Sequence, residues 1–278
     1  MSVFTDKWID EHKDELVEKL QQCVRINSVR DDGSAREGAP FGEGAAKCLE
    51  DTLNTAKAMG FEVKNLDGYC GTVDYGMGEE QLGILAHLDV VPEGEGWTYP
   101  PYAAEIHDGR LYGRGTMDDK GPAFAALFGL AAVKASGVET KRRVRLILGC
   151  DEECGMGCLH HYNEVEKAPD MCFSPDASYP LVNSEKMIYN SAYRKEYASS
   201  VRVKAGTVSN AVPGKAEVYV PVSADEVKAA VAKLNNADFT YNVSAADNGA
   251  NVVITGIAAH ASTPEQGRNA FLAAVQLM

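Results

Sequence analysis

The chain has 278 residues, of which 45% are hydrophobic and 24% charged, and its formal net charge is −13. This composition is typical of a folded globular protein and excludes low-complexity disorder, and the length allows one large domain or two ordinary ones. The negative charge argues against a nucleic-acid partner and against an anionic membrane surface, because both need clustered lysine and arginine.

The N-terminal segment MSVFTDKWIDEHKDELVEKL carries charges throughout and has no apolar core, so it does not resemble a signal peptide. No run approaches the roughly 20 apolar residues that a membrane helix needs. The seven cysteines are expected to be free thiols, since nothing in the sequence directs the chain to an oxidising compartment. We therefore expect a cytoplasmic protein without a membrane partner.

Helical and strand patterns alternate through the first part of the chain. The run LGILAHLDVV is nearly continuously apolar, as in a strand buried on both faces, and Asp108-Gly109 is a typical hairpin turn. In chain order we expect helices over 6–25 and 44–59, strands over 61–65, 71–75 and 82–91, a hairpin of 104–106 and 110–112, a helix over 121–136, and strands over 143–148 and 171–174. This order predicts an α/β fold with a central, mostly parallel sheet and helices on both faces.

After about residue 185 the pattern changes. We expect strands over 197–204 and 216–220, a helix over 224–234, strands over 239–243 and 251–255, and a helix that begins near Pro264. This β-β-α-β-β order predicts a separate, smaller α+β domain, so we divide the chain into domains 1–185 and 186–278. Because NAFLAAVQLM stops at Met278 inside an expected amphipathic helix, we also expect the chain to be truncated there.

His87 and Asp89 lie at the C-terminal end of the predicted buried strand. A spacing of two directs both side chains to the same face, and α/β sheets bind ligands at the C-terminal ends of their strands. A carboxylate beside a histidine can fix the imidazole tautomer for a metal. On its own, however, such a pair is more often a hydrogen-bonded loop end.

Further carboxylates occupy comparable positions. GRGTMDDKGP places Asp118 and Asp119 just before a predicted helix, where either could instead be an N-cap. CDEECG places Glu152 and Glu153 at a strand end, where neighbouring acids repel one another unless a dication lies among them. One of the two glutamates can then bind metal while the other acts as a base on a water molecule.

SPDASYP places Asp176 just beyond another short strand. Together with the histidine and the other carboxylates, it completes a mixed donor set that suits zinc, manganese or cobalt. Three cysteines at 150, 154 and 158 offer an alternative thiolate site, but without a C-x-x-C spacing we favour packing for them. A Rossmann oxidoreductase is disfavoured because no glycine-rich phosphate loop follows the first buried strand.

In this order, HLDVVP, GRGTMDDKGP, DEECG and SPDASYP resemble the metal-binding motifs of the M20 family of metallopeptidases, most closely the PepV-like bacterial dipeptidases. The resemblance implies a catalytic domain with an inserted α+β lid domain, of which the chain contains a part. It implies that His87 and Asp176 each bind one of two metals from opposite sides, that Asp118 bridges the metals, and that Glu153 binds one of them. Asp119 is not expected to be a ligand.

The resemblance also implies the remaining roles. Glu152 would be the general base that acts on a metal-bridged water, and Asp89 would orient the metal-binding histidine. GIAAHASTPEQGRNA resembles the lid segment that supplies a histidine, so His260 would stabilise the oxyanion. Asn210, within SNAVPGKAEVYV, is expected to approach the substrate. The implied cofactor is Zn²⁺, two ions per complete site, with Mn²⁺ or Co²⁺ as alternatives, and the implied substrate is a small dipeptide.

The sequence departs from the family pattern in one respect. The family's last metal ligand is a histidine near the C-terminus of a longer chain, and no histidine follows His260 here. Two alternatives therefore stand beside an active metal-dependent dipeptidase: an inactive truncated fragment, or a site that a second polypeptide completes. Two other functions also stand as alternatives, an N-acyl amino-acid or succinyl-diamine deacylase of the same family and a non-catalytic binding protein.

Overall fold

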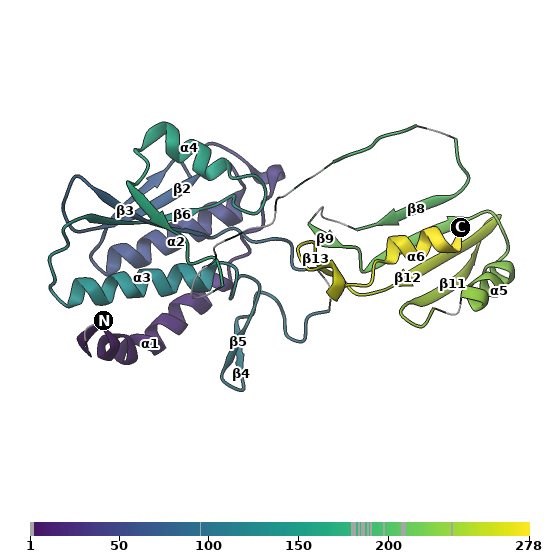
Figure 1. Ribbon diagram of the computed structural model, residues 1–278, viewed down its shortest axis with the longest axis horizontal. Coiled ribbons are helices and arrows are strands. Elements are labelled where there is room, and N and C mark those ends of the chain that lie inside the picture. Colours follow the sequence, from purple (N-terminus) through teal and green to yellow (C-terminus); the bar gives the residue numbers. More distant parts are fainter. Residues whose placement is uncertain are drawn as a thin grey trace. The chain divides into compact units, whose positions relative to one another are not determined.

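The structure is a computed structural model (Figure 1) that describes residues 3–94, 96–178, 182, 184, 187, 189, 191–196, 198–206, 210–234 and 236–278. The chain divides into two compact units, Met1–Val182 and Asn183–Met278, close to the division expected from the sequence. Each unit has its own hydrophobic core. Among the described residues, no helix has both the length and the apolar character needed to cross a membrane.

A five-stranded sheet with the order β1-β2-β6-β3-β7 forms the centre of the first unit. Its strands are β1 (Glu62–Leu66), β2 (Cys70–Tyr75), β3 (Gln81–His87), β6 (Arg143–Gly149) and β7 (Met171–Phe173). β3 pairs in parallel with β6 and β7, whereas β2 pairs antiparallel with β1 and β6. The α/β class is confirmed, but the sheet is mixed rather than mostly parallel. A short link such as Asp67–Tyr69 can only join antiparallel strands, because a parallel pair needs a long crossover.

Helices cover both faces of this sheet. They are α1 (Val3–Val24), α2 (Glu43–Ala58), α3 (Lys120–Ala135) and α4 (Gly157–Val165). α2 packs on β1 and β2, α3 packs on β3 and β6, and α1 packs on α3. α4 lies on the opposite face, where Cys158 approaches Gly149. The predicted helices are confirmed to within a few residues, and Gly60 after α2 has the left-handed φ of 79° that ends a helix.

Of two smaller features in the first unit, a hairpin was predicted and a 3₁₀ turn was not. The predicted hairpin forms as β4 (Glu105–His107) and β5 (Arg110–Tyr112). Its turn residues Asp108 and Gly109 have φ values of 52° and 73°, the left-handed conformations that a two-residue hairpin turn requires. A short 3₁₀ turn, η1 (Asp32–Ser34), was not predicted.

The second unit is a four-stranded antiparallel sheet, β11-β12-β10-β8, covered by two helices. Its elements are β8 (Arg202–Ala205), β9 (Ala211–Val212), β10 (Lys215–Val220), α5 (Ala224–Leu234), β11 (Thr240–Ala246), β12 (Gly249–Thr255), β13 (Ala259–His260), η2 (Pro264–Gln266) and α6 (Ala270–Leu277). The predicted strand start at Tyr197 lies outside the described residues. The helix expected near Pro264 is a single 3₁₀ turn, and α6 begins only after Asn269, whose side chain accepts hydrogen bonds from the first backbone N–H groups of the helix.

A buried ion network ties the sheet of the first unit to α4. Arg145 donates to both carboxylate oxygens of Asp74 at 2.7 and 2.9 Å and to Glu166 at 2.7 Å. The hydrogen bond from Arg145 lowers the pKa of Glu166, and a second bond from Lys64 adds to this effect. Because the pKa of Glu166 is lower in the folded state than in the unfolded state, its ion pairs stabilise the fold above about pH 4.5. This stabilisation is lost as the pH falls through the folded-state pKa.

We therefore expect the free energy of unfolding of the first unit to fall more steeply in the wild type than in a Glu166→Gln variant when the pH is lowered from about 5 to about 3. Urea unfolding followed by tryptophan fluorescence checks this, since both tryptophans, Trp8 and Trp97, lie in the first unit. Glu164→Gln, which changes an exposed carboxylate in the last turn of α4, two residues before Glu166, should keep the wild-type pH dependence. Equal pH dependence of the wild type and Glu166→Gln would contradict the prediction.

Candidate metal centre

The strands β3, β6 and β7 run parallel, so their C-terminal ends meet at one edge of the first unit's sheet. β3 ends at His87, and β6 and β7 end shortly before Glu152 and Asp176. Asp118 lies just before the first residue of α3, which packs on β3. The fold thereby gathers the predicted metal-binding and base residues of the first unit at a single place.

His87 lies at the centre of this group. Its Nε2 atom is 3.0 Å from Asp118 Oδ1, 3.5 Å from Asp176 Oδ2 and 3.9 Å from Glu152 Oε2. The side chains form two sets of possible metal donors, and within each set the donor atoms lie within 4.8 Å of one another. The first set comes from His87, Asp118 and Asp176, and the second from His87, Glu152 and Glu153. Both sets share the histidine, which is 2% exposed.

Asp89 connects the histidine to the acidic loop. The Nδ1 atom of His87 lies 3.0 Å from the backbone carbonyl of Asp89, which can only accept, so the proton belongs on Nδ1 and Nε2 faces the carboxylates. The two carboxylate oxygens of Asp89 accept hydrogen bonds from the backbone N–H groups of Glu152 and Glu153, each at 3.1 Å. Asp89 is 1% exposed, so this one buried residue holds the imidazole through its backbone carbonyl and the two glutamates through its carboxylate.

Asp119 belongs to neither set of possible metal donors. Its Oδ2 accepts a hydrogen bond from the backbone N–H of His87 at 3.0 Å, and its Oδ1 is buried without a hydrogen-bond partner among the described residues. Burial raises the pKa of Asp119 to about 7. Although Asp119 occupies the N-cap position of α3, its side chain makes no capping bond there. It supports the end of β3 instead, a role that the sequence analysis did not assign.

Lys120 is a second residue that the sequence analysis did not single out. It is fully buried, and its ammonium group donates to the backbone carbonyls of Cys23 at 3.1 Å and Ile26 at 2.8 Å. These carbonyls lie at the end of α1, so Lys120 joins that end to the start of α3 beside Asp118. A lysine directly before the predicted helix over 121–136 was the available signal, but sequence alone does not show that such a lysine is buried.

The electrostatics of the site favour a cation. Burial raises the pKa of Glu153 to about 7, with the charge of Asp118 adding to the effect, and burial also raises the pKa of Glu152. Burial alone would lower the pKa of His87, but its hydrogen bonds to Asp118, Asp176 and Asp89 outweigh this and raise it well above its usual range. Crowded carboxylates that raise one another's pKa and favour a protonated imidazole are the donor set that a divalent cation fits.

The remaining predicted site residues lie in the second unit. The backbone of His260 in β13 pairs with Ala211 in β9, and the N–H of Ala261 donates to the carbonyl of Asn210 at 2.8 Å, so Asn210 and His260 are neighbours. The Nδ1 atom of His260 accepts a hydrogen bond from the backbone N–H of Ser262 at 3.2 Å. This bond places the proton of the neutral ring on Nε2, and the exposed imidazole can therefore donate a hydrogen bond from that atom.

The alternative thiolate site finds no support in the described part of the chain. All seven cysteines are free, and Cys150 and Cys158 are buried whereas Cys154 is exposed. None of the side-chain groups there that could hold a metal ion includes a cysteine.

The buried imidazole and carboxylates at the edge of an α/β sheet define a candidate centre for divalent cations. Comparison with known proteins identifies the family. The chain belongs to the peptidase family M20/M25/M40, whose model matches residues 83–263. That range includes all the residues of the candidate centre, and the predicted family membership is confirmed.

The similar proteins are longer than this chain. It is 38% identical over 268 residues to "Putative dipeptidase YtjP" of Bacillus subtilis (strain 168), a match that covers 93% of this chain and 58% of the relative. It is 36% identical over 270 residues to the Beta-Ala-Xaa dipeptidase of Lactobacillus delbrueckii subsp. lactis, covering 92% and 57%. Human carnosine dipeptidase 1 aligns with a TM-score of 0.49 and 26% identity over 58% of this chain and 37% of that structure.

Proposed function

We propose that this chain is part of a metal-dependent dipeptidase that hydrolyses small dipeptides. The observation that carries the proposal is the convergence of one buried histidine and several carboxylates on a single sheet edge, in a chain of the M20/M25/M40 family. The similarity to proteins named as dipeptidases supports the substrate class. In this proposal residues 1–185 are the catalytic, metal-binding portion, and residues 186–278 are part of the lid domain.

The proposed metal ligands are His87, Asp118, Glu153 and Asp176. They would hold two divalent cations, with zinc as the first candidate and manganese or cobalt as substitutes, because imidazole and carboxylate donors suit these ions. The bound cations would supply Lewis-acid polarisation of the scissile carbonyl and lower the pKa of the attacking water.

The chain's own residues would carry the proton transfers. Glu152 is the proposed general base, which takes a proton from the attacking water and delivers it to the leaving amine. Burial raises the pKa of Glu152, which is the direction that a base that must later act as an acid requires. Asp89 holds the loop that carries Glu152 through the hydrogen bond at 3.1 Å, and thereby keeps the base in position.

Two residues of the second unit complete the proposal. His260 is proposed to stabilise the oxyanion through its Nε2 proton, and Asn210 to bind the substrate. Both assignments rest on the resemblance of residues 256–270 and 209–220 to lid segments of the family, and the tautomer of His260 fits a hydrogen-bond donor. The seven free thiols support a reducing compartment, so the cytoplasm is the proposed location.

Metal analysis and a substrate panel test the proposal on the purified chain. We expect bound divalent metal, hydrolysis of dipeptides with a free amino terminus, loss of that activity with a chelator, and recovery with Zn²⁺ or Mn²⁺. A dipeptide with N-terminal β-alanine belongs in the panel because of the Lactobacillus relative's name. Hydrolysis that is indifferent to the chelator, or a preference for N-acyl amino acids over dipeptides, would contradict the proposal.

A further inference from the structure

Two thiols from different helices lie side by side in the core of the first unit. Cys23 belongs to the last turn of α1 and Cys48 to α2, and their Sγ atoms are 3.4 Å apart. Both residues are fully buried. Neither belongs to a set of possible metal donors among the described residues, so the chemistry of this pair is separate from that of the metal centre.

The surroundings of the pair favour a thiolate at Cys48. The hydrogen bond with Cys23 lowers the pKa of Cys48, burial opposes this effect, and the positive charge of Lys120 lowers the pKa further. The same hydrogen bond, together with burial, raises the pKa of Cys23 well above its usual value. A thiolate is the form of cysteine that an oxidant attacks, and a thiol beside it can convert the product into a disulfide.

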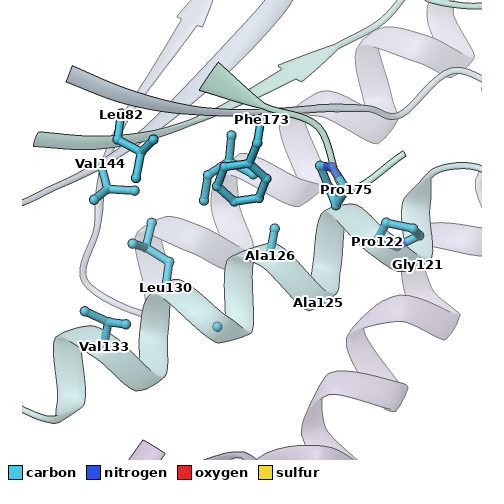
Figure 2. Close-up of a pocket in the computed structure, with 12 residues that line it drawn as sticks. Leu82, Gly121, Pro122, Ala125, Ala126, Leu130, Val133, Val144, Phe173 and Pro175 are labelled. Atoms are coloured by element: carbon cyan, nitrogen blue, oxygen red, sulfur yellow. The ribbon is translucent and has the colours of Figure 1, made fainter. Parts of the chain in front are cut away.

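Lys120 connects the pair to the metal centre on one side. Its ammonium group donates to the backbone carbonyl of Cys23 at 3.1 Å, and it lies two residues after Asp118. Figure 2 shows that the residues after it, Gly121 and Pro122, line a pocket between α3 and the sheet, and the described lining of this pocket is apolar or glycine. The pocket side of the helix start therefore offers no polar side chain, whereas Lys120 supplies a charged tie to α1.

Leu88 connects the pair to the metal centre on the other side. The Sγ atom of Cys48 lies 3.9 Å from the backbone carbonyl of Leu88, which is the residue between His87 and Asp89. A disulfide requires an Sγ–Sγ distance of about 2.05 Å, so the two sulfur atoms have to approach one another by roughly 1.4 Å. Such a movement shifts the ends of α1 and α2 against the backbone that carries the histidine.

We propose that Cys23 and Cys48 are a modification site, at which hydrogen peroxide forms a disulfide that weakens metal binding until a thiol reductant removes it. The Cys48 thiolate attacks the O–O bond, which gives a sulfenic acid and hydroxide. The Cys23 thiol then attacks this sulfur, the S–S bond forms, and the sulfenic hydroxyl leaves with the thiol proton as water. The hydroxide takes up the proton that Cys48 had released. In total the two thiols lose two electrons and two protons, and one peroxide becomes two waters.

Burial sets the kind of oxidant. Because both thiols are enclosed, the reaction needs local opening around the end of α1, which favours a molecule close to water in size over a bulky disulfide reagent. Disulfides in a reducing compartment are usually transient and redox-sensing, and a bond that a thiol reductant removes fits that setting. The disulfide does not depend on the proposed function, and only its effect on the metal rests on it.

The experiment treats the purified 278-residue chain with hydrogen peroxide, removes the oxidant, and identifies linked peptides by mass spectrometry of an unreduced digest. Zinc affinity of the treated protein is measured by competition with a chromogenic chelator. The decisive variant is Cys48→Ala. The matched control is Cys70→Ala, which removes another fully buried thiol of the first unit, one that has no hydrogen-bonded thiol partner among the described residues.

We expect linked peptides of Cys23 and Cys48 in the wild type and in Cys70→Ala, their loss with dithiothreitol, and none in Cys48→Ala. Zinc affinity should fall about tenfold on oxidation of the wild type and of Cys70→Ala, recover on reduction, and stay unchanged when Cys48→Ala is treated in the same way.

The two parts of the proposal fail in different ways. Cys23 and Cys48 that remain free thiols while the exposed Cys154 is oxidised would overturn the disulfide. A disulfide without a change in zinc affinity would overturn its link to the metal centre. A reduced chain that binds no zinc would overturn both that link and the proposed function, while the peptide analysis would still decide whether the disulfide forms.

Discussion

Glu152→Gln is expected to reduce dipeptide hydrolysis by a factor of about 10² to 10⁴ while the metal content of the protein stays unchanged. Glutamine has nearly the same shape as glutamate but cannot take a proton from water, so the change removes the proposed base and little else. The backbone N–H of residue 152 still donates to Asp89, which keeps the loop in place. The measurement is turnover of a dipeptide by the metal-loaded protein, alongside metal content by elemental analysis.

The neighbouring glutamate provides the matched control. Glu152 and Glu153 both belong to one donor set with His87, and each has a backbone N–H bonded to Asp89, so geometry alone does not separate the base from the ligand. We expect Glu153→Gln to lower metal content and Glu152→Gln to leave it intact. The opposite pattern would exchange the two roles, and full activity of Glu152→Gln would remove this residue from the mechanism.

The elements that sequence patterns predicted well are those with both periodicity and clear end signals. The helix α5 was predicted at its observed bounds, Ala224–Leu234, with Ser223 or Asp225 expected to begin it, and the structure shows Ser223 and Glu226 forming a reciprocal cap at its start. The mixed sheet was not predicted, since strand direction depends on how long each connection is and where it runs. The turn at Pro264 was mistaken for a helix start because a proline at a first helical position has the same sequence signal in both structures.

The candidate site was predicted at the level of motifs but not of individual side-chain orientations. Separate weak signals at the ends of β3, β6 and β7 became specific in combination, and the fold brings them together. Asp118 and Asp119, in contrast, are adjacent and identical in type. The side chain of Asp118 is 63% exposed and faces His87, whereas Asp119 is fully buried behind the strand end. Only the path of the backbone distinguishes them, and no sequence pattern encodes that path.

Asp89→Asn tests whether one buried carboxylate organises the centre. Both of its oxygens accept backbone N–H groups, so an asparagine must turn its NH₂ group toward one of them and leave a buried donor unpaired. We expect the first unit to lose about 1–3 kcal/mol of its free energy of unfolding. We also expect the affinity for Zn²⁺ to fall about 10- to 100-fold, because the loop that carries Glu152 and Glu153 loses an acceptor and the charge of Asp89, 3.4 Å from His87 Nδ1, is removed.

Urea unfolding followed by tryptophan fluorescence measures the first effect, and competition with a chromogenic chelator measures the second. Asp170→Asn is the matched control, since Asp170 also accepts a backbone N–H, from Gln81 at 2.8 Å, but is exposed and outside the donor group. It should destabilise the first unit less than Asp89→Asn, because water replaces the lost bond, and should leave zinc affinity unchanged. If Asp89→Asn weakened folding without weakening zinc binding, Asp89 would stabilise the loop but would not position the metal ligands.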